Sequence, residues 1–147
     1  MEMVTVVCSI WIPALPERVW QAVTEGEQLT CWYSPGSPWE ITELKAGETV
    51  YFHHSPNKYH EGSEVVTMRA VIETVETHRI FALRWDLGAS DPVMVTTFIV
   101  KAKNDGTQAT ITETGYESEE QAKPTKEGYA MSLENLKAFI EGTKLPY

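Results

Sequence analysis

The fold is decided by residues 93–115, which read VMVTTFIVKAKNDGTQATITETG. Two stretches, 93–103 and 107–115, are rich in Val, Ile and Thr, the residue types that favour strands. Between them stands Asn104-Asp105-Gly106, and such residues tolerate the positive φ angles that a tight hairpin turn requires. The stretch therefore predicts two antiparallel strands joined by a short turn.

Downstream of this hairpin, the apolar residues follow a helical period. They recur at i, i+4, i+7 and i+11 and so form one continuous stripe. Gly142 follows the stripe, at the position where a helix C-terminus favours glycine. The pattern predicts one long C-terminal helix whose apolar stripe is Tyr129, Leu133, Leu136 and Ile140.

Upstream, the chain begins with a strand pattern and continues with helical signals. Residues 3–12 are apolar and β-branched and stop at Pro13, which predicts a strand. Pro16 stands at the favoured first position of a helix. The apolar face of that helix consists of Val19, Trp20 and Val23.

A second short helix is predicted over about residues 24–31. Thr24 and Glu27 have the spacing of a capping box, in which each side chain bonds a backbone N–H of the first turn. Leu29 and Trp32 follow on one side. The helix pair is too short to cover a whole sheet and would close one end of it.

The middle of the chain alternates between strands and turns. The period of two places Phe81, Leu83 and Trp85 on one face of a strand. Pro and Gly content predicts a loop over 33–38, and polar residues predict loops over 54–63 and 86–92. The predicted strands are 39–44, 48–53, 65–76 and 80–85, with a turn at 45–47.

The element order predicts an α+β helix-grip fold in one domain. About six to seven strands in consecutive hairpins give a curved antiparallel sheet. Only the C-terminal helix is long enough for the sheet to wrap around. A crevice between sheet and helix follows from this arrangement, and such crevices commonly bind small molecules.

Composition and charge exclude several classes of protein. The 147 residues carry a net charge of −9, which disfavours binding to nucleic acid and to anionic membranes. No apolar run reaches the length of a membrane span, and the N-terminus lacks the basic region of a secretory signal. Two cysteines, Cys8 and Cys31, make no disulfide framework, so we expect reduced thiols in a cytoplasmic protein, with a reactive Cys31 as the alternative.

The chain resembles the activator of Hsp90 ATPase homologue family, within the START-like superfamily, over about residues 4–142. The opening Pro13-Ala-Leu-Pro-Glu-Arg-Val-Trp20 is similar to the start of that family. The resemblance implies a helix-grip fold, and members of this superfamily include lipid carriers, cyclases and co-chaperone domains. Further matching features occur in the family's order: Trp32, Gly47, Leu83-Arg-Trp85, Gly106-Thr107, Glu113-Thr-Gly115, Gly128-Tyr129, Leu133 and Leu136-Lys137.

Five residues are candidates for a ligand site in the crevice. Glu113 shares a strand face with Ala109 and Ile111 and is expected to point inward, where an acid can anchor a ligand or transfer a proton. The alternatives for Glu113 are exposure to solvent near Gly115 or pairing with an arginine (Arg69 or Arg84). The aromatic candidates, for which plain core packing is the alternative, are Trp39, Trp85, Phe98 and Tyr129.

The histidines are weak candidates for a metal site. His53, His54 and His60 lie close in sequence, with Glu61 and Glu64 nearby. Adjacent strand residues point to opposite faces, however, so His53 and His54 are not expected to converge on one ion. We therefore predict a polar loop and no cofactor.

Three functions stay open from the sequence. The aromatic residues favour binding of a small hydrophobic molecule. The resemblance implies instead an interaction module for an Hsp90-type chaperone. An enzyme that uses Glu113, a histidine or Tyr129 as acid–base ranks third, because the chain has no nucleophile elbow or phosphate loop. Either edge strand, 4–12 or 39–44, could pair across a homodimer, so monomer and dimer both stay open.

Overall fold

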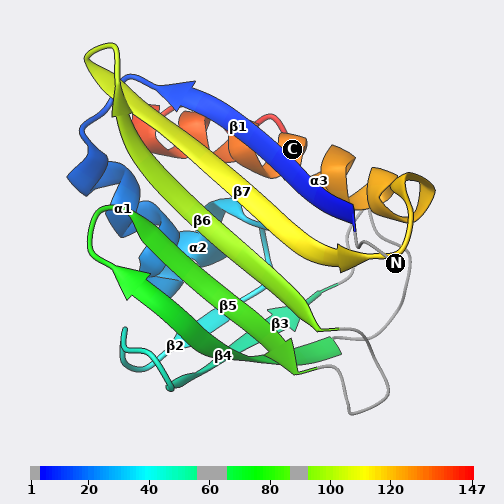
Figure 1. The fold of residues 1–147 in the computed structure, drawn as a ribbon. Helices are drawn as coiled ribbons and strands as arrows, with labels where there is room; N and C mark the ends of the chain where they lie inside the picture. The colour runs from blue at the N-terminus through cyan, green and yellow to red at the C-terminus, as the bar shows by residue number, and fades with distance from the viewer. Residues whose placement is uncertain (1–3, 56–65, 87–92) are drawn as a thin grey trace.

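The computed structural model describes residues 4–55, 66–86 and 93–147. These residues form seven strands and three helices, joined by loops. Figure 1 shows their arrangement. In chain order they are β1 (Val4–Ile12), α1 (Pro16–Thr24), α2 (Gly26–Trp32), β2 (Trp39–Ile41), β3 (Thr49–His54), β4 (Val66–Glu76), β5 (Ile80–Asp86), β6 (Met94–Lys103), β7 (Gly106–Tyr116) and α3 (Glu119–Glu141).

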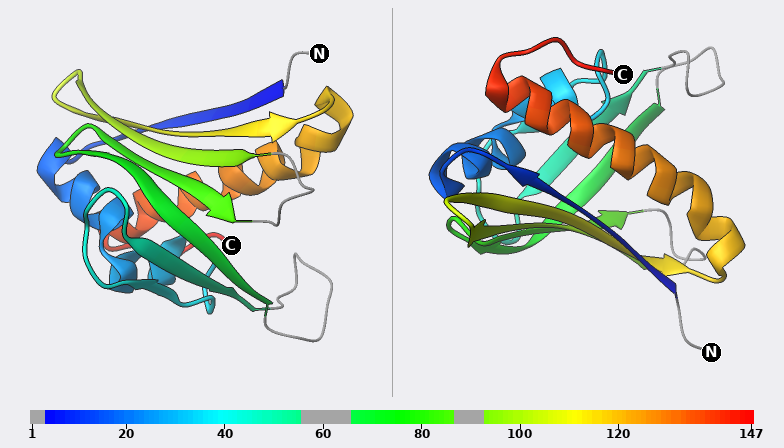
Figure 2. Two further views of the ribbon diagram at one scale, coloured as in Figure 1. Left: turned by 60° about the horizontal axis from the view of Figure 1, so that its bottom comes forward. Right: turned by 90° about the horizontal axis from the view of Figure 1, so that it is seen from above.

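The strands form one antiparallel sheet in the order β1-β7-β6-β5-β4-β3-β2. All neighbours except β1 and β7 are consecutive along the chain, so β1 pairs with a strand that is distant in sequence. The sheet curves around α3, while α1 and α2 lie at one end (Figure 2). The predicted α+β helix-grip fold is confirmed.

The β6–β7 hairpin forms as the sequence predicts. Lys103 pairs with Gly106, and the two residues between them, Asn104 and Asp105, have φ angles of 48° and 61°. Gly106 is the first residue of β7, where a Cβ would come within 2.5 Å of the Ile12 carbonyl oxygen. The close approach of β1 therefore requires glycine here.

Helix α3 matches the predicted stripe and its predicted end. The Ser118 side chain accepts a hydrogen bond from the Gln121 N–H at the start of the helix. Gly142 ends the helix in the left-handed conformation, with φ of 76°. Tyr129, Leu133 and Leu136 are buried under the sheet, and Ile140 is partly buried.

The predicted capping box is wrong, although the second helix exists. Thr24 is the last residue of α1, and its hydroxyl donates to the Trp20 carbonyl oxygen (2.7 Å). Thr24 thus belongs to the end of α1 and does not cap α2. Helix α2 instead begins after Glu25, whose backbone is extended and whose side chain makes no cap bond.

Strand β2 is shorter than predicted, because the chain leaves the β2–β3 ladder after Ile41. The Gly47 N–H donates to the Ile72 carbonyl oxygen (2.8 Å), so the connection between β2 and β3 also bonds to β4. Residues 3 and 65, and most of the predicted loops 54–63 and 86–92, lie outside the described residues.

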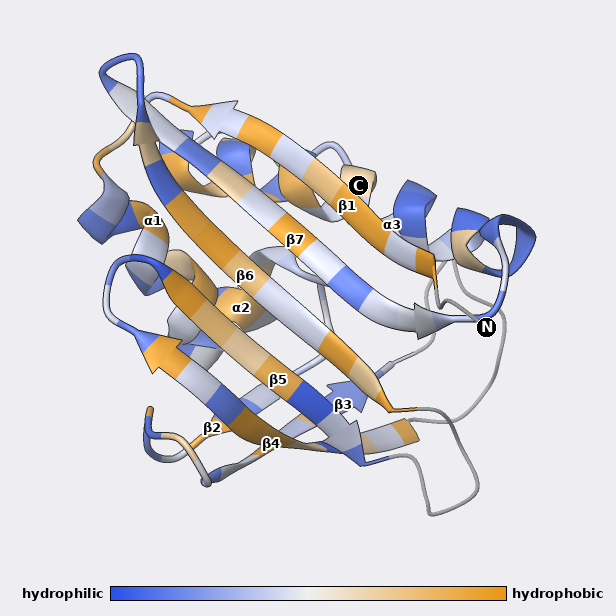
Figure 3. Cartoon of the chain, in the orientation of Figure 1, coloured by the Kyte–Doolittle hydropathy of each residue, from blue (hydrophilic) through white to orange (hydrophobic). Residues whose placement is uncertain are grey.

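Apolar side chains fill the interior between the sheet and the helices. As predicted, Phe81, Leu83 and Trp85 all face inward. Burial alternates along β7, where Ala109, Ile111 and Glu113 are buried and the residues between them are only partly buried. Figure 3 shows both orange and blue residues on this strand. The part of the interior next to α1 and α2, which we call the packed core, is defined by five side chains that are at most 2% exposed: Trp32, Phe81, Phe98, Leu133 and Leu136.

No helix among residues 4–55, 66–86 and 93–147 combines the length and the apolar character that crossing a membrane requires.

Candidate functional site

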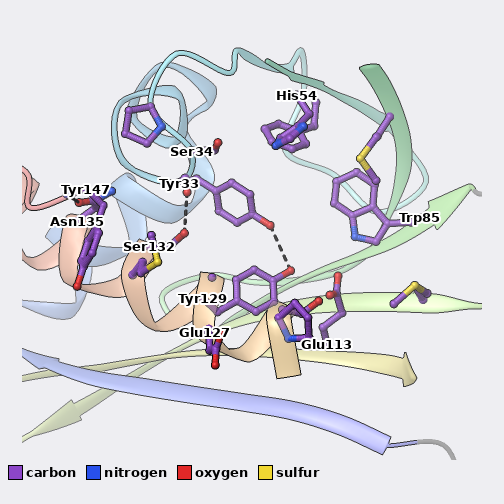
Figure 4. Close-up of a pocket in the computed structure, with 18 of the residues that line it drawn as sticks. Tyr33, Ser34, His54, Trp85, Glu113, Glu127, Tyr129, Ser132, Asn135 and Tyr147 are labelled. Carbon is purple, nitrogen blue, oxygen red and sulfur yellow. Dashed lines mark hydrogen bonds between the residues drawn. The ribbon is translucent and has the colours of Figure 1, made fainter. Parts of the chain in front are cut away.

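A cavity of about 640 Å³ lies between α3 and the inner face of the sheet. Its walls come from β3 to β7, from α3 and from the loop that follows α2. Figure 4 shows Tyr33, Trp85, Glu113 and Tyr129 gathered around this space. Methionines from β4, β6 and α3 complete much of the apolar lining: Met68, Met94 and Met131.

Glu113 is the buried acid of this cavity, with 7% of its surface exposed. Its Oε1 accepts a hydrogen bond from the Thr96 hydroxyl (2.6 Å), and its Oε2 accepts one from the Tyr116 hydroxyl (2.5 Å). Thr96 in turn accepts from the indole N–H of Trp85 (2.8 Å). A chain of donors from three strands thus converges on the carboxylate.

A bulge at Gly115 places Tyr116 beside Glu113. Residues three apart in a regular strand face opposite sides. Here Thr5 pairs with Thr114 and Val4 with Tyr116, so Gly115 is an extra residue without a partner on β1. Its φ of 113° is an angle that glycine adopts readily and other residues rarely do. A Cβ at this position would lie 2.7 Å from the Val93 carbonyl oxygen. The bulge therefore reverses the alternation and turns Tyr116 inward.

Two further tyrosines meet across the cavity. The Tyr33 hydroxyl donates to the Tyr129 hydroxyl (3.2 Å), as the dashed line in Figure 4 marks. The backbone of Tyr33 is bonded to α3, because its carbonyl oxygen accepts a hydrogen bond from the Ser132 hydroxyl (2.7 Å). Its ring packs edge-on against Trp39 and Phe52, at 5.0 Å and 5.4 Å between centroids. Packing on several sides thus gives this phenol a defined position.

The cavity keeps its tyrosines uncharged. Burial raises the pKa of Tyr33 and Tyr129 well above the ordinary value, and the nearby carboxylate of Glu113 adds to the effect. Burial also raises the pKa of Tyr116, as does its hydrogen bond to Glu113. At neutral pH all three hydroxyls are therefore neutral groups that can donate and accept hydrogen bonds.

The structure brings together three of the five candidates from the sequence. Trp85, Glu113 and Tyr129 line the cavity, whereas Trp39 and Phe98 do not. Phe98 stacks on Phe81 (5.9 Å between centroids) in the packed core. Trp39 packs against Phe52 (4.8 Å), behind the lining. Both side chains face inward, but neighbouring aromatic rings separate them from the cavity.

Glu113 forms no ion pair with either arginine that the sequence offered. Arg69 lies near Asp86 instead (3.6 Å), and Arg84 is exposed. The alternation along β7 explains this, because Ala109, Ile111 and Glu113 are all buried on the inner face. The expectation that Glu113 points inward is met.

Several lining residues were missed by the sequence analysis. Tyr33 was assigned to a Pro/Gly loop, and Tyr116 follows Glu113 at a spacing that suggests the opposite face. The signal for Tyr116 was available in Gly115, because a glycine inside a strand pattern often marks a bulge. The three lining methionines carried no comparable signal.

The two described histidines of the predicted cluster diverge, as expected. His53 contacts Glu40 through Nε2 (2.7 Å) and Thr67 through Nδ1 (2.8 Å). His54 faces the other way and lines the cavity. His60, Glu61 and Glu64 lie outside the described residues. Within the described ranges, no three His, Cys, Asp or Glu side chains gather as metal ligands would.

Both cysteines are free thiols. Cys8 is partly buried beneath α3, and its thiol donates to the Lys126 carbonyl oxygen (3.4 Å). Burial raises the pKa of Cys8, which disfavours the reactive thiolate. Cys31 is exposed and bonds the Glu27 carbonyl oxygen one turn earlier in α2 (3.3 Å).

A curved antiparallel sheet around a long C-terminal helix, with a cavity between them, defines a START-like helix-grip protein. The family model described as Activator of Hsp90 ATPase homolog 1-like protein matches residues 13–141. The chain therefore belongs to this family. No curated protein matches the chain in sequence.

Solved structures share the fold over nearly the whole chain. Protein MLL2253 from Mesorhizobium loti is 20% identical, with a TM-score of 0.75, and the match covers 97% of this chain and 100% of that one. Protein Ms6760 from Mycobacterium smegmatis is 20% identical, with a TM-score of 0.73 and coverage of 95% and 92%. Mll3558 from Rhizobium loti is 23% identical, with a TM-score of 0.70 and coverage of 92% and 96%. At these identities the likeness shows the fold alone.

Proposed function

We propose that the chain binds a small, largely apolar molecule in the cavity between the sheet and α3. The observation that carries the proposal is the cavity itself, about 640 Å³ in volume and lined mainly by aromatic and methionine side chains. Ligand sites in proteins typically enclose about 300–1,000 Å³ and combine an apolar lining with a few fixed polar groups. Glu113 and the hydroxyls around it supply such groups here.

The candidate residues have different roles in this proposal. Trp85 and Tyr129 contact the ligand directly, and Glu113 orients its polar end. Trp39 and Phe98 act indirectly, because they support the rings that form the wall. Methionine side chains adapt to irregular shapes, so the lining tolerates variation in the apolar body of the ligand.

Native mass spectrometry of the purified chain tests the proposal. The protein is incubated with a panel of hydrophobic metabolites, and we expect a one-to-one complex with at least one compound. Thermal unfolding with the same compound should show a higher Tm, because a ligand that binds only the folded state stabilises it. A panel that yields neither a complex nor a shift in Tm contradicts the proposal.

A pair of substitutions at Gly128 shows whether binding occurs in this cavity. Gly128 lies on α3 in the cavity wall, and a Cβ built there meets no atom within 4 Å. Gly128→Phe should therefore fill the space and abolish binding, whereas Gly128→Ala should retain it. Equal binding by both variants would place the ligand elsewhere.

The name of the family suggests a second function, the interaction with an Hsp90-type chaperone. An acidic chain, with net charge −9, could contact a basic face of such an ATPase. An assay of chaperone ATPase activity separates the two functions. Stimulation that persists in the Gly128→Phe variant supports interaction with the chaperone. No stimulation at a saturating concentration of the chain excludes that interaction as its function.

Acid–base catalysis is the third function. It would use Glu113 and Tyr129, which lie on the same cavity. Its test is turnover of a compound that the mass spectrometry identifies as bound. If Glu113→Gln and Tyr129→Phe leave turnover unchanged in folded protein, neither residue is catalytic.

A further inference from the structure

The charged groups of the cavity are unbalanced, and the imbalance points to a class of ligand. Two acids, Glu113 and Glu127, are among the described residues that line the cavity, but no lysine or arginine is. His54 is the one described lining residue that could carry a positive charge. The cavity is therefore a site of negative potential inside a chain that is itself acidic.

The described residues leave part of the hydrogen-bonding capacity of Glu113 unused. A carboxylate can accept about four hydrogen bonds. Among the described residues, Glu113 accepts two, from Thr96 and Tyr116, and has no ion pair with a basic side chain. Since a buried carboxylate is costly without a counter-charge, a cationic donor would be the group that complements it best.

The walls around this carboxylate suit a cation as well. Aromatic side chains from five separate segments line the cavity, among them Tyr33, Phe52, Trp85, Tyr116 and Tyr129. The electron-rich faces of such rings attract ammonium groups, and the attraction grows when water is excluded. Aromatic rings beside a carboxylate are thus the chemistry that ammonium recognition requires.

We infer that the cavity selects a ligand with a protonated amine attached to an apolar body, with the amine at Glu113. This inference rests on the proposed function and names the class of its ligand. Fatty acids, phosphates and other anions are disfavoured, because they would face the carboxylate of Glu113 without a lysine or arginine in the described lining.

Three probes that share one carbon skeleton test the inference by calorimetry at pH 7: phenylbutylamine, phenylbutanol and phenylbutyrate. The amine is almost fully protonated at this pH. Hydrogen bonds to charged groups contribute roughly 1.5–3 kcal/mol, so the amine should bind about tenfold to a hundredfold more tightly than the alcohol. The carboxylate should bind most weakly.

Two glutamate variants identify the residue responsible. Glu113→Gln keeps the size of the side chain and should remove the preference for the amine over the alcohol. Glu127→Gln removes the same charge from an exposed position on the cavity wall and should keep most of the preference. If Glu113→Gln and Glu127→Gln reduce the preference equally, the general charge of the chain accounts for it and the inference is overturned.

The outcomes separate the two proposals. If the wild-type chain binds the alcohol as tightly as the amine, the cavity binds ligands but the inference fails. If it binds none of the three probes and none of the metabolite panel, the proposed function fails, and the inference with it. The wild-type comparison needs no variant, so it decides the matter even if Glu113→Gln does not fold.

Discussion

The packed core and the cavity lie under the same sheet and against the same helix, yet they are built differently. In the packed core, α3 presents Leu133 and Leu136, which belong to the same buried cluster as the stacked Phe81 and Phe98. About one turn earlier, the same helix presents Gly128 and Tyr129 to open space. One continuous helix thus contributes both to close packing, through Leu133 and Leu136, and to the cavity wall, through residues from Pro124 to Asn135.

The polar atoms of the two regions differ as well. In the packed core, the indole N–H of Trp32 is satisfied by the Ala22 carbonyl oxygen (2.8 Å). The cavity instead gathers the buried carboxylate of Glu113, the phenols of Tyr33, Tyr116 and Tyr129 and the indole of Trp85 around a space. The difference teaches that stability and recognition depend on separate residues in this fold, so substitutions should be able to change one without the other.

The largest expected effect on stability comes from truncating one large apolar side chain to alanine in each of the two regions. Phe98→Ala should lower the free energy of unfolding by about 3–5 kcal/mol, because it leaves a void in close packing. Met131→Ala should lower it by less than about 1 kcal/mol, because Met131 is only partly buried and borders a space that already exists. Urea denaturation measures both. Similar losses would show that the cavity wall is as tightly packed as the core.

The next effect concerns the bulge that shapes the cavity. Gly115→Ala should lower the free energy of unfolding by about 2–3 kcal/mol, because a left-handed backbone angle and a clash with the Val93 carbonyl oxygen combine. Gly47→Ala is the control, since Gly47 has φ of 93° but its Cβ would meet nothing within 4 Å. That variant should lose only about 1 kcal/mol. Equal losses would mean that the clash relaxes without cost.

Alkaline pH should lower the stability of the folded chain through the tyrosines of the cavity. The pKa values of Tyr33, Tyr116 and Tyr129 are raised in the folded chain, so above about pH 10 the unfolded chain releases protons that the folded one retains. Stability is therefore fully present below pH 10 and falls above it, by up to about 1.4 kcal/mol per pH unit for each of Tyr33 and Tyr129 and by less for Tyr116, which is less buried. Denaturation midpoints between pH 9 and 11 measure this fall.

Tyrosine absorbance provides the check on that prediction. The folded chain should show fewer ionising tyrosines near pH 10 than the unfolded chain does. Tyr129→Phe should reduce the alkaline fall in stability. Complete ionisation of all the tyrosines near pH 10 in folded protein would contradict the burial that we describe for the cavity phenols.

The smallest effect is a gain. Gly128→Ala should raise the free energy of unfolding by about 0.5–1 kcal/mol, because alanine has the higher helix propensity and its Cβ meets no atom within 4 Å. Thermal denaturation measures the gain. A loss of stability instead would indicate that the backbone of α3 needs glycine at this point.

The elements that the sequence predicts well are those with local signals. The Asn-Asp-Gly turn, the stripe on α3 and the inward direction of Glu113 all follow from the neighbours of each residue in the chain. The predicted capping box is wrong because Thr24 is the last residue of α1, where its hydroxyl donates to the Trp20 carbonyl oxygen of the same helix.

The composition of the cavity was harder to predict for a physical reason. The period of two says which face of a strand a residue occupies but not which end of the interior it reaches. Trp39 and Phe98 therefore seemed as good as Trp85, although other rings cover them. Tyr33 comes from a loop, and Tyr116 follows a bulge, so neither obeys a period at all.

The pairing of β1 with β7 has a consequence for how the chain folds. Val4 pairs with Tyr116 and Ile12 with Thr107, and α3 packs against β1 as well. Contacts between residues so distant in sequence form slowly and require most of the chain to have been synthesised. Strand β1 can therefore pair only after β7 has been synthesised, and until then its backbone is open to pairing with other chains.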